Sequence, residues 1–95
     1  MQDDLFLSLV IPTYNERGNI KPLVEELSAL LDEKARDRYE LIVVDDDSPD
    51  RTWEVAEEIS ENFSRLRVLR RLGQRGLSAA VVAGWQIARG RVRVR

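Results

Sequence analysis

The 95 residues of this chain include no cysteine and no histidine, and only 6% of them are aromatic. The absence of cysteine excludes a disulfide scaffold, a thiolate nucleophile and a cysteine zinc site. Without histidine as well, acid–base chemistry and metal binding fall to aspartate and glutamate, whose carboxylates favour Mg²⁺ or Mn²⁺. The chain also lacks a bilayer-spanning apolar run and a signal peptide, so the sequence predicts a cytoplasmic protein.

Acidic residues are missing from the last third of the chain. All 17 acids lie at or before Glu61, together with six bases, which gives that part a net charge of −11. The residues after Glu61 contain nine arginines and no acid, a charge of +9, so the two parts sum to −2. A basic part of this kind can face phosphates or an anionic membrane surface. A plainer interpretation of this positive charge is that the chain is one part of a domain whose next acidic residues come later in the sequence.

With 43% hydrophobic and 34% charged residues, the composition is that of one small globular unit. Apolar runs alternate with amphipathic stretches, which predicts an α/β fold with a parallel sheet, right-handed crossovers and flanking helices. The expected strands are 5–11, 40–45 and 67–69, with a fourth from Val92, and the expected helices are 19–34, 51–62 and 77–88. Trp53, Ala56, Ile59 and Phe63 share one face of the second helix and are predicted to lie in the core.

The run 41–44 ends abruptly in three carboxylates, Asp45, Asp46 and Asp47, followed by Ser-Pro-Asp. Such a run is typical of a strand buried on both faces, and open α/β sheets bind ligands beyond the carboxyl ends of these strands. Three adjacent like charges cost energy unless a metal, a polar ligand or water compensates for them. Turns after strands also favour Asp, Ser and Pro, so an ordinary turn is the alternative for this segment alone.

A second strand end of the same kind follows the run 5–11. Pro12 cannot donate to a central ladder and is expected to mark the exit from the strand. Tyr14, Asn15 and Glu16 then offer a ring face, an amide and a carboxylate, the groups that recognise a base and a ribose. Two such loops at one sheet edge favour a ligand site over ordinary turns.

Other α/β ligand sites fit less well. The first strand lacks the following glycine-rich turn of a dinucleotide-binding domain or a P-loop. A phosphoacceptor receiver domain needs an acidic pair there, and only Glu16 is near. The basic loop 70–76 is short, has no interleaved aromatics and belongs to a chain of pI about 5.2, so we expect no nucleic-acid binding. A loop that faces phosphates, or is simply solvated, fits it better.

Three segments together resemble family 2 glycosyltransferases. They are Ser8-Leu9-Val10-Ile11-Pro12-Thr13-Tyr14-Asn15-Glu16, Val43-Val44-Asp45-Asp46-Asp47-Ser48-Pro49-Asp50 and Arg75-Gly76-Leu77-Ser78-Ala79-Ala80-Val81-Val82-Ala83-Gly84-Trp85. Within that family the chain is most similar to the dolichol-phosphate (polyprenyl-phosphate) mannosyltransferases, and the resemblance covers residues 5–90. It implies a Rossmann-like A-type glycosyltransferase fold, of which residues 1–95 form a single incomplete domain, its amino-terminal, nucleotide-recognition part.

The resemblance also implies which residues bind the nucleotide-sugar donor. Pro12, Tyr14 and Glu16 resemble the loop that receives the base and the ribose. Val44 and Asp46 resemble the strand end that contacts the base, with Asp46 as its polar anchor.

Neighbouring residues resemble the supporting parts of that site. Asp45 is expected to support the loop, while Ser48 and Asp50 shape the turn and cap the second helix. Asp47 and Ser78 depart from the family, because both stand where glycine is commonest. Serine is acceptable there as a helix N-cap, whereas Asp47 leaves the local backbone conformation open.

The larger departure follows Gly90. The family continues there with an apolar strand ending in Asp-x-Asp, which holds a divalent metal (Mg²⁺ or Mn²⁺) and the donor's diphosphate. This chain has Arg91-Val92-Arg93-Val94-Arg95 instead. The catalytic residues and metal ligands are therefore expected beyond the chain end, as are the acids that would balance the basic part.

The resemblance implies an inverting transfer of a sugar, mannose from GDP-mannose first among the options, to a polyprenyl or dolichyl phosphate. The complete enzyme is expected in the cytoplasm, at the cytoplasmic face of a membrane, and the chain alone is expected to be inactive. The alternative is a catalytically incomplete remnant that binds only nucleotide or a partner protein.

Overall fold

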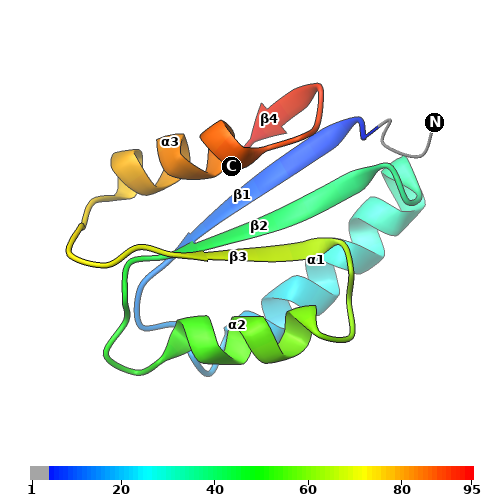
Figure 1. Cartoon of the computed structure of the whole chain (residues 1–95). Helices are drawn as coiled ribbons and strands as arrows, with labels where there is room; N and C mark the ends of the chain where they lie inside the picture. The colour runs from blue at the N-terminus through cyan, green and yellow to red at the C-terminus, as the bar shows by residue number, and fades with distance from the viewer. Residues whose placement is uncertain (1–4) are drawn as a thin grey trace.

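The computed structural model describes residues 5–95, which form one sheet of four parallel strands in the order β3-β2-β1-β4. The strands are β1 (Leu7–Thr13), β2 (Tyr39–Asp45), β3 (Leu66–Arg70) and β4 (Val92–Val94). The helices are α1 (Ile20–Ala35), α2 (Thr52–Ser60) and α3 (Leu77–Ile87). Helices α1 and α2 cover one face of the sheet and α3 covers the other (Figure 1). The predicted class, strand order along the chain and parallel sheet are confirmed.

Strand β1 differs from its predicted bounds, because it continues through Pro12 to Thr13. Pro12 pairs with Val44 of β2, whereas β4 pairs only with Leu7–Leu9 on the other side. Within the described residues, the β4 side of β1 has no partner strand beyond Leu9. The missing amide donor of Pro12 therefore costs no ladder bond on that side. The prediction that Pro12 ends the strand was wrong for this reason.

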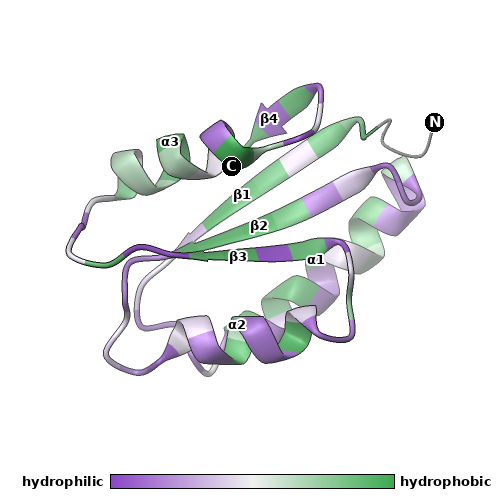
Figure 2. Ribbon diagram, viewed as in Figure 1, coloured by the Kyte–Doolittle hydropathy of each residue, from purple (hydrophilic) through white to green (hydrophobic). Residues whose placement is uncertain are grey.

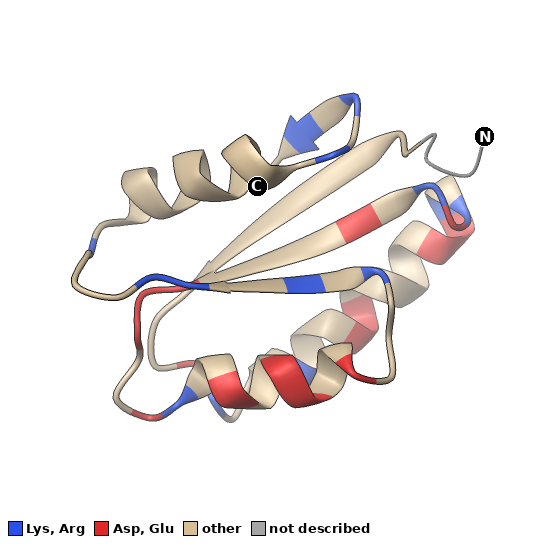
Figure 3. Ribbon diagram, in the orientation of Figure 1, with Lys and Arg blue, Asp and Glu red and all other residues tan. Residues whose placement is uncertain are grey.

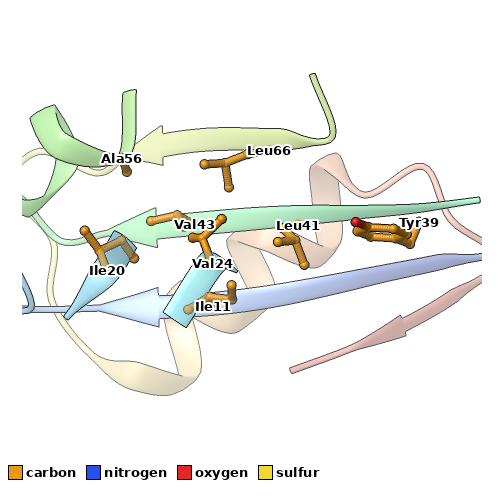
Figure 4. Packing of buried hydrophobic residues seen from close by; sticks show 8 residues of the cluster. All are labelled: Ile11, Ile20, Val24, Tyr39, Leu41, Val43, Ala56 and Leu66. Carbon is orange, nitrogen blue, oxygen red and sulfur yellow. The ribbon is translucent and has the colours of Figure 1, made fainter. Parts of the chain in front are cut away.

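The larger core lies between the sheet and helices α1 and α2. Successive residues of a strand point to opposite faces, so alternate apolar positions of β1 and β2 face these helices. Figure 4 shows the buried side chains that meet there, Ile11, Ile20, Val24, Tyr39, Leu41, Val43, Ala56 and Leu66. In Figure 2, most of β1 and β2, the two central strands, is coloured green for hydrophobic residues.

Helix α3 packs against the other face through small side chains. Ala80 lies in a second buried cluster with Val10, Ile42 and Val44. At Gly84 an added Cβ would lie 2.6 Å from Val10 Cγ1, so the glycine permits the close approach of helix and sheet. Small residues of α3 thus determine how closely this helix approaches the sheet.

One predicted core residue lies elsewhere. Trp53 belongs to neither hydrophobic cluster. Its ring lies beneath two guanidinium groups, with the Arg70 Cζ 3.7 Å and the Arg51 Cζ 4.9 Å from the ring centroid. The prediction that Trp53 lies in the core was wrong, because Arg70 at the end of the edge strand β3 and Arg51 at the start of α2 cover its ring instead of aliphatic side chains.

The helices begin near their predicted positions, and the N-cap residue agrees with the prediction for α1 but differs for α2 and α3. Asn19 occupies the N-cap of α1, yet its side-chain amide donates to Glu16 Oε1 at 3.0 Å. Arg51 occupies the N-cap of α2 in the left-handed region, while the Asp50 carboxylate accepts from the Thr52 amide at 3.0 Å. Gly76, not Ser78, occupies the N-cap of α3.

A buried polar cluster joins the amino ends of the strands on the α3 face. Glu40 accepts from Ser8 Oγ at 2.6 Å, Arg67 Nη1 at 2.9 Å and the Arg89 amide at 2.7 Å. The Gly90 amide donates to Ser8 Oγ at 2.8 Å. Burial raises the pKa of Glu40, but these hydrogen bonds outweigh it and hold the pKa below its ordinary value. The cluster fixes the segment that leads into β4.

We expect Gly90→Ala to lower the free energy of unfolding by about 1–3 kcal/mol, as overpacking does. A Cβ at this position would lie 2.7 Å from the Leu7 carbonyl carbon and from the Ser8 amide nitrogen, both backbone atoms that cannot rotate away. Urea denaturation measures the change. The matched control is Gly18→Ala, where an added Cβ meets nothing within 4 Å. Equal stability of the two variants would contradict the close approach at Gly90.

Candidate functional site

The loops that follow β1, β2 and β3 meet at the carboxyl edge of the sheet (Figure 1). Chain order reverses at β1, since β2 and β3 lie on one side of it and β4 on the other. Ligand sites of open α/β sheets lie beyond the carboxyl strand ends at such a reversal. The predicted site segments are therefore brought together at the edge where this fold binds ligands.

Asp45 holds the end of β2 to the end of β1. The carboxylate of this fully buried residue accepts from Thr13 Oγ1 at 2.6 Å, from Ser48 Oγ at 2.7 Å and from the Ser48 amide at 2.9 Å. Three donors compensate the buried charge, as burial requires. The expected supporting role of Asp45 is confirmed.

Three successive backbone amides of the loop after β1 donate to side chains of the loop after β2 and of the first residue of α2. The Asn15 amide donates to Ser48 Oγ at 2.9 Å and the Glu16 amide donates to Thr52 Oγ1 at 2.9 Å. The next amide, at position 17, donates to Asp50 Oδ2 at 3.0 Å. These bonds fix the backbone that follows Tyr14 without using the Tyr14 ring, which stays exposed.

Asp46 forms a buried, two-pronged ion pair with Arg71. Arg71 Nε lies 2.7 Å from Asp46 Oδ1 and Arg71 Nη2 lies 3.1 Å from Asp46 Oδ2. The two side chains are 9% and 7% exposed, respectively. The hydrogen bonds to Asp46 raise the pKa of the Arg71 guanidinium. Arg71 also donates to Gln74 Oε1 at 2.9 Å, so the same guanidinium shapes the loop before α3.

Asp47 pairs with Arg70, whose Nη2 lies 2.7 Å from Asp47 Oδ1. Its φ of 53° falls in the left-handed region, which explains why glycine would suit this position. Figure 3 shows the red segment after β2 beside the blue end of β3. The charges of Asp46 and Asp47 are therefore compensated by the chain's own arginines, without the metal or polar ligand considered from the sequence.

A hollow of about 250 Å³ opens between these loops and the start of α3. Its lining residues are Pro12, Thr13, Tyr14, Asp46, Arg75, Gly76, Leu77 and Ala80. A second hollow of about 290 Å³ adjoins it and shares Asp46 and Arg75. The combination of an aromatic ring, a carboxylate and apolar walls suits a flat heterocycle with N–H donors at its edge.

Three of the five predicted binding residues line this hollow: Pro12, Tyr14 and Asp46. Val44 is fully buried in the hydrophobic cluster that also contains Ala80. Glu16 is exposed and lies in the loop between β1 and α1, where its carboxylate accepts from Asn19. The structure does not place either of them on the hollow's surface.

Arg71 and Arg75 are the site residues that the sequence did not reveal. One signal was present in the sequence, because two arginines lie at and after the end of β3, beside β2, which runs into three aspartates. Adjacent parallel strands bring their carboxyl ends together, so the complementary charges predict ion pairs. Arg71 is accordingly neither solvated nor free to face a phosphate, which corrects that interpretation of the basic loop at this residue.

The described aspartates do not fit a divalent metal. The carboxylates of Asp46 and Asp47 are paired with arginines, and that of Asp45 accepts three hydrogen bonds. No group of three or more Asp and Glu side chains within residues 5–95 is arranged to hold a metal ion. A metal used by a larger enzyme would need other ligands.

A larger hollow of about 480 Å³ lies between α1 and α2, away from the strand ends. It is lined by Lys21, Glu25, Glu58 and Phe63 among others, and none of the predicted site residues contributes to it. Among the helices of residues 5–95, none combines the length and apolar character required to cross a membrane.

Comparison with known proteins adds a family and a fold. The sequence profile described as Glycosyl transferase family 2 matches residues 8–94. The chain is 48% identical over 87 residues to a dolichol-phosphate mannosyltransferase of Pyrococcus furiosus, covering 90% of this chain and 23% of that protein. It is 36% identical over 97 residues to a dolichyl-phosphate beta-glucosyltransferase of Saccharomyces cerevisiae, covering 95% and 29%, respectively.

A solved structure gives the same picture. A mannosyltransferase from Pyrobaculum calidifontis, in complex with GDP-Man and Mn²⁺, superposes with a TM-score of 0.69 at 28% identity. The match covers 90% of this chain and 25% of that one. The chain thus spans about a quarter of the length of the proteins that it resembles.

Proposed function

The chain belongs to glycosyl transferase family 2, and from this premise we propose that its strand-end hollow recognises the nucleotide of a sugar donor. The complete enzyme would transfer a hexose, mannose from GDP-mannose in the first place, to a polyprenyl or dolichyl phosphate with inversion. The observation that carries the proposal is the pairing of an exposed Tyr14 ring with the Asp46 carboxylate across one hollow.

The ring and the carboxylate have separate tasks in this proposal. The Tyr14 ring would stack on the base, and Asp46 would accept from an N–H at the edge of the base. Arg71 occupies one position on each Asp46 oxygen, and each oxygen retains a further lone pair. Guanine presents two adjacent N–H donors and uracil one, so the same carboxylate accommodates both and favours guanine.

Both mannosyl- and glucosyltransferases resemble this chain, so the base of the donor needs a test of its own. Comparing GDP, UDP and ADP by titration calorimetry gives the base preference, and GDP is expected to bind most tightly. No binding of any nucleotide at millimolar concentrations would overturn the proposal. If UDP binds most tightly, the proposed nucleotide site stands, but the donor becomes a UDP-sugar such as UDP-glucose.

A divalent metal, Mg²⁺ or Mn²⁺, would neutralise the leaving diphosphate in the complete enzyme. The aspartates at the strand end are already bound by arginines, hydroxyls and an amide of the chain. These residues would therefore supply the binding site for the base, and not the metal ligands, to the complete enzyme. An ionised acceptor phosphate is already a nucleophile, so no strong general base is required. We expect no release of GDP from GDP-mannose by the 95-residue chain with Mn²⁺ and polyprenyl phosphate, and metal-dependent release would show that these residues include a catalytic centre.

The second candidate is a remnant that binds only nucleotide or a partner protein. The coding DNA after the codon for Arg95 discriminates between the two. An Asp-x-Asp strand and an acceptor region in any frame favour the transferase, and their absence favours the remnant. Liposome co-sedimentation tests whether the exposed arginines of 91–95 bind an anionic membrane surface, as a cytoplasmic-face location would require.

We expect Tyr14→Ala to weaken GDP binding by about 1–3 kcal/mol, the usual contribution of a base stacked on an aromatic ring. The ring is 37% exposed, so its removal leaves the core intact. Calorimetry on the folded variant measures the effect. Phe6→Ala is the matched control, because Phe6 is an exposed aromatic residue that precedes β1 at the opposite edge of the sheet. Equal affinities of the two variants would remove Tyr14 from the site.

A further inference from the structure

The loop between β3 and α3 begins at Arg71, and the arginines in and beside it differ in their partners. Arg70 is paired with Asp47 and stacked on Trp53. Arg71 is paired with Asp46. Arg75 forms no ion pair with a carboxylate among residues 5–95, and its guanidinium carbon lies 4.6 Å from the centroid of the Tyr14 ring. The basic loop therefore presents one uncompensated cation at the site.

That cation lies at the border of the two hollows. Arg75 and Asp46 are the residues that line both of them. The stack of Arg75 on Tyr14 joins the loop after β3 to the loop after β1 over the first hollow. A base that stacks on the ring face under Arg75 must displace this side chain.

The backbone around Arg75 allows the side chain to change partners. Gly76 has a φ of 125° and Gly73 a φ of 72°, and an added Cβ at either position would meet nothing within 4 Å. Arg71, by contrast, anchors the loop through Asp46 and Gln74. Arg75 is exposed, so its side chain can leave the Tyr14 ring without breaking this anchor.

We propose that Arg75 exchanges partners on ligand binding: it covers the Tyr14 ring in the empty site and binds a phosphate of the nucleoside diphosphate in the filled one. An exposed cation–π contact is weak, whereas a guanidinium–phosphate pair is charge-assisted and often two-pronged. The exchange lets one arginine cover the Tyr14 ring in the empty site and then raise the affinity for ligands that carry phosphate. This inference rests on the proposed nucleotide site.

The test compares guanosine with GDP in the whole chain by calorimetry. Arg75→Ala is expected to weaken GDP binding about tenfold, the loss of one charge-assisted hydrogen bond. Guanosine affinity should stay unchanged or increase, since the competitor for Tyr14 is gone. Arg75→Lys should restore most of the GDP affinity, and added salt should weaken GDP binding by the wild-type chain more than by Arg75→Ala.

The matched control is Arg89→Ala, which removes the same charge from an exposed side chain beside the polar cluster at the opposite end of the strands. Equal losses for guanosine and GDP in Arg75→Ala, or no loss for either, would overturn the exchange while leaving the nucleotide site in place. A wild-type chain that binds neither compound would overturn the proposed function, and the exchange with it.

Discussion

Replacing Asp46 by alanine is expected to lower the free energy of unfolding by about 3–5 kcal/mol, because it leaves the buried Arg71 guanidinium without its partner. Both side chains are less than a tenth exposed, so the guanidinium would keep its charge in a largely buried position without the carboxylate that compensates it. Urea denaturation followed by circular dichroism measures the loss. A change below about 1 kcal/mol, the value of a surface pair, would contradict the burial of this ion pair.

A double variant separates the effect on the fold from the effect on binding. Asp46→Leu combined with Arg71→Met replaces the pair by apolar side chains, which is often neutral for buried ion pairs. We expect this variant to recover most of the stability and to bind GDP or UDP more weakly by about 1–3 kcal/mol, since the base loses its hydrogen-bond acceptor. Nucleotide affinity equal to that of the wild type would remove Asp46 from the proposed site.

Glu40→Ala is expected to lower the free energy of unfolding by about 2–4 kcal/mol at pH 7, because three donors lose a buried carboxylate. Those donors are the Ser8 hydroxyl, Arg67 and the Arg89 amide. Ser60→Ala is a suitable control, since its exposed hydroxyl makes only a local bond to Glu57 within α2.

The same carboxylate predicts a pH dependence. The pKa of Glu40 in the folded chain lies below the ordinary value of 4.5. Its contribution to stability is therefore complete above pH 4.5 and is lost as the pH falls through the folded pKa. The difference between wild type and Glu40→Ala should shrink over that range in urea titrations from pH 7 to pH 3. A constant difference would mean that Glu40 is not stabilised as a carboxylate.

The periodicity of the sequence predicted the elements well. Buried runs and helical stripes depend on local patterns, and each predicted strand and helix exists within a few residues of its expected bounds. The errors concern partners distant in sequence. Pro12 stays in its strand because β4 pairs with so little of β1, and Trp53 leaves the core because Arg70 covers it.

The site was predictable in part for the same reason. The strand-end positions of Tyr14 and Asp46 follow from the apolar runs that precede them. The bond between Asp46 and Arg71 joins residues 25 apart, and only the order of the strands brings them together. Charge complementarity between neighbouring strand ends was readable in the sequence, whereas the stack of Arg75 on Tyr14 depends on loop conformation.

The hydrogen bond from the Gly90 amide to Ser8 has a consequence for the order of folding. It joins residues 82 apart, and closing a loop of that length costs about 4 kcal/mol of chain entropy beyond a constant. Strand β4 can therefore dock only after β1, β2 and β3 have formed a surface that offsets this cost. During synthesis, β1 leaves the ribosome first but waits for its last neighbour until nearly the whole segment has emerged. The side of β1 that pairs with β4 lacks this partner throughout that interval.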